Sequence, residues 1–88
     1  MKITYKDFVR VVPSGIMPDE ELFNSMQGFV DDSCRRVRRF LGPELYDSIA
    51  AVNPDLGVPE TDHEGILAQA CVRYVCARAY YEASAHLD

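Results

Sequence analysis

The chain has 88 residues, 48% of them hydrophobic and 26% charged, which suits one modest core and leaves too little chain for a second. We therefore expect a single folded domain over residues 1–88, without extensive disorder. Fourteen acidic and nine basic residues give a formal net charge of −5, which argues against the uniformly basic surface of a stand-alone nucleic-acid-binding protein.

Targeting, membrane and metal signals are absent from the sequence. Charged side chains interrupt the first ten residues, so we expect no secretory signal, and no stretch of about 18 residues is free of charge, so we expect no membrane-spanning helix. The cysteines form no Cys-x-x-Cys pair and share no ligand spacing with the two histidines. We therefore expect no metal site, and three buried thiols in a reducing cytoplasm: Cys34, Cys71 and Cys76.

Apolar residues at steps of three and four predict a first helix over residues 4–12. Thr4 is placed to cap it, with Asp7 in the capping-box position, and the Pro-Ser-Gly sequence at 13–15 would end it. Its β-branched residues leave a strand as the alternative.

A second and longer helix is expected over residues 18–41. Pro18 suits the first helical position, and Gly42 followed by Pro43 would stop the helix. A single apolar stripe predicts its inner face, made of Leu22, Met26, Phe29, Val30, Cys34, Val37, Phe40 and Leu41.

The Gly-Pro corner opens a third predicted helix over residues 43–52, followed by a loop over 53–61. The inner face of the helix would carry four apolar residues: Leu45, Tyr46, Ile49 and Val52. The loop holds two prolines and one glycine and is long for a compact domain, so it is a candidate functional surface.

The last helix is expected over residues 62–86, capped by Thr61 or Asp62. Apolar side chains occupy most of its circumference, which is typical of a helix buried on several sides. Either it is the central helix of the bundle, or part of its surface meets another protein. The sequence thus predicts an all-α fold, a small bundle of about four helices.

Four arginines crowd into the segment Arg-Arg-Val-Arg-Arg at positions 35–39, which we call the basic segment. It is interpreted either as a solvated face that offsets the helix dipole, or as a patch for phosphates or an acidic partner. Five successive positions spread around a helix instead of forming one face, which favours the solvated interpretation. If the patch is functional, a lone helix of this kind fits contact with a nucleic-acid backbone better than base readout. The candidate partner or nucleic-acid contacts are Arg35, Arg36, Arg38 and Arg39.

Signatures of catalysis are missing from the sequence. There is no Gly-rich phosphate loop, nucleophile elbow or zinc-binding helix motif. Glu82 and His86 are four residues apart and could meet, but they lack a third catalytic partner. We therefore expect a protein that is not an enzyme, with no cofactor and no small-molecule substrate.

Four segments occur together in a characteristic order. Ile-Thr-Tyr-Lys-Asp-Phe at 3–8 precedes an acidic helix start, Pro-Asp-Glu-Glu-Leu at 18–22. The long helix then runs into Phe-Leu-Gly-Pro-Glu-Leu-Tyr-Asp at 40–47, and an Ala- and Tyr-rich helix follows at 66–83. Over roughly residues 3–83 the sequence resembles the small helical head–tail connectors, or head-completion adaptors, of tailed bacteriophages, as found in prophages of gut Bacteroidales.

This resemblance implies a structural protein of the virion. Such connectors assemble as a ring beneath the portal, meet a tail-completion protein and continue the channel through which DNA passes. The resemblance places assembly in the bacterial cytoplasm and implies no cofactor. Members often continue beyond the last helix, whereas this sequence stops at Asp88, so a C-terminal docking tail is in question. The candidate interface residues lie in the loop and the last helix: Leu56, Val58, Tyr74, Arg78 and Tyr81.

Two interpretations from other classes stay open. A small protein-interaction module, antitoxin-like or adaptor-like, would form a fixed dimer and no larger ring. A DNA-binding helical domain would use the basic segment, with Gly42-Pro43 as the corner of a helix-turn-helix, although the apolar helix that follows leaves few polar side chains to read bases. Salt-dependent binding to duplex DNA would favour that interpretation.

Overall fold

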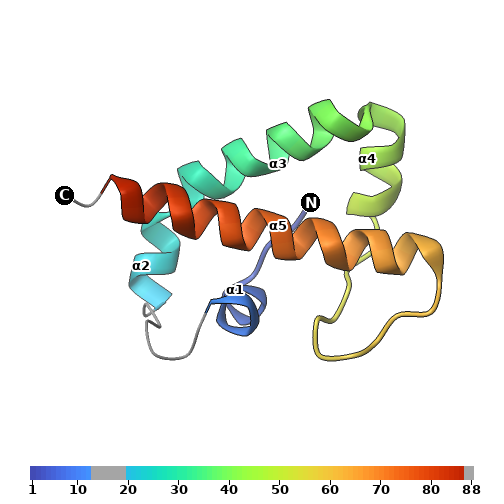
Figure 1. The fold of residues 1–88 in the computed structure, drawn as a ribbon, viewed down its shortest axis with the longest axis horizontal. Helices are drawn as coiled ribbons and strands as arrows, with labels where there is room; N and C mark the ends of the chain where they lie inside the picture. The colour runs from blue at the N-terminus through green and yellow to red at the C-terminus, as the bar shows by residue number, and fades with distance from the viewer. Residues whose placement is uncertain (13–19, 87–88) are drawn as a thin grey trace.

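The part of the chain that the structure describes, residues 1–12 and 20–86 of a computed structural model, consists of helices and contains no strand. The all-α class predicted from the sequence is confirmed. The expected stop at 13–15 and the expected helix start at Pro18 lie outside the described residues. The helices, drawn in Figure 1, are α1 (Tyr5–Val11), α2 (Glu20–Ser25), α3 (Gln27–Leu41), α4 (Pro43–Ala50) and α5 (His63–Ala85).

The first element is a helix and not the alternative strand, because its capping box closes as predicted. The Asp7 amide donates a hydrogen bond to Thr4 Oγ1 at 3.2 Å, and the Thr4 amide donates one to Asp7 Oδ2 at 3.0 Å. This reciprocal pair satisfies two amides that the first turn leaves without helical partners. The cap fixes the start of α1 and directs Phe8, which is fully buried, into the core.

The prediction of a single helix over residues 18–41 is wrong, because the helix is interrupted at Met26, which separates α2 from α3. Met26 has φ −91° and ψ 4°, and its amide donates to the Phe23 carbonyl at 3.0 Å. The Ser25 hydroxyl donates to the Leu22 carbonyl at 2.7 Å, and so engages the acceptor that the Met26 amide would use in a continuous helix. The break lets α2 pack against α1 while α3 packs against α5.

The central element is α5, which contacts α1, α3 and α4 (Figure 1). Its buried face is made largely of small side chains, which let the neighbouring helices approach closely. Aromatic side chains from α1 and α2 fill the space beside it, with the Phe8 and Phe23 ring centroids 5.4 Å apart. The buried residues of α5 are Gly65, Ala68, Cys71, Val72, Val75, Cys76, Ala79 and Ala83.

The corner between α3 and α4 turns at Gly42, whose φ of 87° and ψ of 155° are essentially restricted to glycine. The turn sends α4 back toward α5, while α3 diverges from α5 as it approaches the corner (Figure 1). The inward positions predicted for Phe40 and Leu45 are therefore wrong, since both side chains are exposed. Phe40 is 88% exposed and Leu45 is 41% exposed.

The remaining boundaries differ from the prediction by one or two residues. α4 ends at Ala50, and α5 begins after Asp62, whose side chain makes no capping hydrogen bond. Between them the chain forms the expected loop, with Leu56 buried against the core. Within the described residues, no helix has the length and apolar character needed to cross a bilayer.

Candidate functional site

An apolar groove opens where α3 and α5 diverge. It has a volume of about 720 Å³, which lies within the range of pockets that hold small ligands or the side chains of a partner. The C-terminal half of α3 forms one wall and the N-terminal half of α5 the other. The lining residues are Arg36, Val37, Arg39, Phe40, Leu41, Leu67, Ala70, Cys71 and Tyr74.

The floor of the groove is buried and its rim is exposed. Val37 and Cys71 belong to the core, whereas Phe40 and Tyr74 stand 88% and 44% exposed. Exposed aromatic rings beside an apolar depression are typical of protein-binding surfaces, because such rings supply large contact area at low cost in side-chain entropy. The groove thus offers binding contacts that the folded chain itself leaves unused.

The basic segment divides around α3. Arg36 and Arg39, three positions apart, border the groove, and Arg35 and Arg38 are also exposed. Asp32 pairs with Arg35 and Arg36 at 3.9 and 3.4 Å. Among the described residues, Arg39 forms no ion pair, so this part of the rim carries positive charge that the chain does not neutralise locally.

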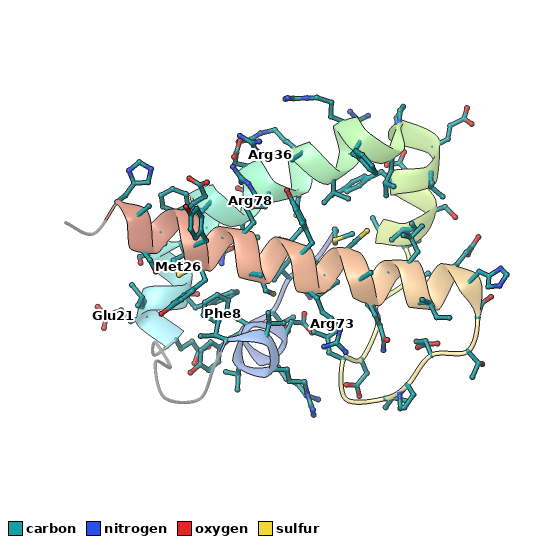
Figure 2. All side chains as sticks on the ribbon, in the orientation of Figure 1. Phe8, Glu21, Met26, Arg36, Arg73 and Arg78 are labelled. Atoms are coloured by element: carbon teal, nitrogen blue, oxygen red, sulfur yellow. The ribbon has the colours of Figure 1, made fainter. Side chains whose placement is uncertain are left out.

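Arg78, predicted as an interface residue, lies inside the bundle with only 14% of its side chain exposed. It reaches from α5 toward α3 (Figure 2) and donates hydrogen bonds at 2.9 Å to Asp32 Oδ2 and Ser33 Oγ. Glu82 lies 3.6 Å from its guanidinium group. The hydrogen bond from Arg78 holds the pKa of Asp32 below its ordinary value of 3.8. The structure thus gives Arg78 a role in joining α3 to α5.

The 53–61 loop is fastened to α5 by the side chain of Gln69. Its amide nitrogen donates to the Asp55 carbonyl at 2.9 Å and to the Val58 carbonyl at 2.6 Å, and Arg73 donates to the Leu56 carbonyl at 3.4 Å. Leu56 is only 8% exposed, so of the two predicted contact residues in the loop only Val58, at 52%, is available on the surface.

The other side chains singled out on α5 lie apart from the groove. Tyr81 is 71% exposed, and Tyr80 packs its ring against Phe8. Glu82 and His86 do not meet, because Glu82 faces Arg78 whereas His86 stacks on Phe29 with ring centroids 5.5 Å apart. The pair that could have suggested acid–base chemistry is thus engaged separately, Glu82 in an ion pair and His86 in ring stacking.

The three cysteines are free thiols with different degrees of burial. Cys71 and Cys76 are buried as predicted, and burial raises the pKa of Cys76 to about 12. Cys34 is only half-buried, and burial raises its pKa as well. Such thiols stay protonated near neutral pH and are weak nucleophiles. Within residues 1–12 and 20–86, no group of three or more His, Cys, Asp or Glu side chains is placed to hold a metal ion.

The groove is a feature that sequence reasoning missed, because Phe40 continued the apolar stripe of α3 without a break. The one available signal was the position of Phe40 directly before the Leu41-Gly42-Pro43 corner, where a helix turns away from its neighbour.

Comparisons of the chain with protein-family models, curated proteins and solved structures returned no match.

Proposed function

We propose that this protein is a structural adaptor that binds other protein subunits through the α3–α5 groove. The observation that carries the proposal is Phe40, which stands 88% exposed at the edge of an apolar depression. Leaving an aromatic side chain in water forgoes roughly 1.5–3 kcal/mol of burial free energy, which a binding partner can recover. Charged guanidinium groups at the rim would orient that partner.

The specific role proposed is that of a head–tail connector of a tailed bacteriophage, working with copies of itself and with the portal or a tail-completion protein. The sequence resemblance supports this role, and an all-α fold with an exposed apolar groove is compatible with it. The net charge of −5 suits a channel wall past which DNA must slide without sticking. On this proposal the protein needs no cofactor and catalyses no reaction.

The proposal is tested by co-expressing the protein with the portal protein encoded nearest to its own gene. We expect a joint complex in size-exclusion chromatography with light scattering, and its loss when Phe40→Glu places a charge at the groove. Tyr81→Glu is the matched control, because Tyr81 is 71% exposed and lies outside the groove. A complex that survives Phe40→Glu, or no complex with the wild type, would refute the proposal.

A mobility-shift assay with duplex DNA at low salt distinguishes the DNA-binding alternative from the adaptor proposal. Under the adaptor proposal the wild type does not shift the duplex. Binding that weakens steeply with salt and disappears in an Arg36→Glu/Arg39→Glu variant would instead assign the arginine rim to phosphate contacts.

A further inference from the structure

We infer that the groove of one copy receives the 53–62 loop of a second copy, so that the chains associate head to tail. The inference rests on the proposed adaptor role and names the first partner of the groove as the protein itself. It follows from the charge of the groove, the charge and shape of the loop, and the positions of both on α5.

The charge of the groove rules against pairing with another groove. Two-fold pairing would bring the arginine rims of both copies, with Arg36 and Arg39 from each, into one interface. Like charges brought together and desolvated at an interface are costly. The favoured occupant therefore combines an exposed apolar side chain with carboxylates.

The loop offers this combination on the chain's own surface. Val58 is 52% exposed, and the segment 53–62 around it in the sequence carries Asp55, Glu60 and Asp62 and no lysine or arginine. The Arg10 guanidinium group of α1 lies against Gly57, and the Glu60 carboxylate lies against Gly65, so the exposed carboxylates of the loop are those of Asp55 and Asp62. The exposed apolar side chain of Val58 is thus accompanied by two exposed carboxylates, those of Asp55 and Asp62, which can face the arginines at the rim of the groove. Charge complementarity of this kind sets both the partner and the register of an interface.

The loop is also held in a fixed shape before it binds. Gln69 bonds two of its carbonyls, and the Gly57 amide donates to Asp55 Oδ1 at 2.8 Å. The buried side chain of Leu56 anchors the segment to the core. Because the loop is already ordered, docking it costs little further conformational entropy, which favours affinity.

Loop and groove occupy different faces of α5, so one copy cannot fill its own groove. Gln69 and Arg73 hold the loop on one face, whereas Leu67, Ala70 and Tyr74 line the groove on another. In Figure 1 the loop runs below α5, and α3 lies above it. Each docked pair therefore still presents one free groove and one free loop, which is the condition for a heterologous assembly that grows until it closes on itself.

The test measures self-association of the purified chain by sedimentation velocity, up to about 1 mM because contacts below about 1,200 Å² are usually weak. We expect wild type to form species larger than a dimer. Phe40→Glu places a negative charge at the groove, and Val58→Lys replaces the apolar side chain of the loop with a positive charge, so each should block docking at its own site. Both residues are exposed, so the fold should be retained. Each variant should lower the association constant about 30-fold or more, the effect of losing one hot-spot contact.

Mixing the two variants gives the decisive measurement. The intact loop of the Phe40→Glu chain should dock into the intact groove of the Val58→Lys chain, giving a 1:1 heterodimer that grows no further. Tyr81→Glu should associate like wild type. A wild type that stays monomeric at about 1 mM, variants that associate normally, or a mixture that stays monomeric would each overturn the inference.

The outcomes also separate this inference from the adaptor proposal. A wild-type chain that binds the portal protein but never associates with itself would refute the loop–groove contact and leave the adaptor role in place. Complementation between the two variants without any portal complex would do the reverse.

Discussion

The two ends of α5 are built from the same kinds of residues but are covered very differently. Its C-terminal half is enclosed by α1, α2 and the start of α3, where Phe8, Phe23 and Met26 are each at most 5% exposed. Its N-terminal half faces the diverging end of α3, and there Ile66 and Tyr74 stand 49% and 44% exposed. Figure 2 shows Phe8 and Met26 on the enclosed side, near the crossing of α1, α2 and α5.

Both halves of α5 therefore carry buried residues, but in the N-terminal half one face, lined by Leu67, Ala70 and Tyr74, stays open to the groove. A domain of this size buries only about 60–65% of its unfolded surface, so its apolar residues cannot all be enclosed. On the adaptor proposal, the enclosed end supplies stability and the groove at the other end is the surface for partners. If this division is right, substitutions at the two ends should separate stability from association.

The largest effect is expected from a pair of phenylalanines that differ in burial. Phe8→Ala should lower the free energy of unfolding by about 3–5 kcal/mol, because it leaves a cavity among the aromatic rings. Phe40→Ala should change it by no more than about 0.5 kcal/mol, since its ring is 88% exposed. Urea unfolding followed by circular dichroism measures both.

The pair has a built-in control. If Phe8→Ala does not fold, Phe8→Leu keeps the enclosed end measurable with a smaller loss of volume. The same Phe40→Ala protein should lose self-association in sedimentation. Similar destabilisation by both substitutions would mean that Phe40 belongs to the core, and it would contradict the proposed difference between the two ends of α5.

An intermediate effect is expected at the corner that opens the groove. Gly42→Ala forces a side chain into a backbone region that is essentially restricted to glycine and should cost about 1–3 kcal/mol of unfolding free energy. Gly28 is the matched control, because it is exposed in α3 with no neighbouring atom within 4 Å of an added Cβ. Gly28→Ala should stabilise the protein by about 0.5–1 kcal/mol. Thermal unfolding of both variants checks the signs, and a neutral Gly42→Ala would contradict the account of the corner.

The sequence was sufficient to predict what local chemistry determines. Residues close together in the chain determine the capping box at Thr4, the helix stop at Gly42 and the all-α class. These three features were predicted correctly. The break at Met26 was missed because it depends on Ser25 binding a carbonyl that a regular helix would use. Phe40 was misplaced because its exposure depends on how far α3 and α5 diverge, which helical periodicity alone does not encode.

The candidate site could be predicted only in part for the same reason. Exposed residues named from the sequence, such as Tyr74 and Arg36, do line the groove. Arg78 and Leu56 were named with them but are largely enclosed. Which side of a helix meets a neighbour is decided by tertiary packing, so a list of apolar or charged positions does not separate buried residues from available ones.

The smallest effect is expected at the contact that ties α3 to α5 where the groove begins. The hydrogen bond from Arg78 lowers the pKa of Asp32 in the folded state below the ordinary 3.8. The stability that this contact adds is therefore fully present above the pH at which the unfolded carboxyl titrates, and it is lost as pH falls through the lower folded value. We expect the unfolding free energy of Asp32→Asn to lie below that of wild type at pH 6 and to converge with it as the pH falls below the lowered folded-state pKa of Asp32. Urea unfolding across this pH range measures the difference in unfolding free energy, with Asp31→Asn as the exposed neighbouring control. If the difference between wild type and Asp32→Asn stayed constant down to pH 2, the Asp32 charge would add nothing to the α3–α5 contact.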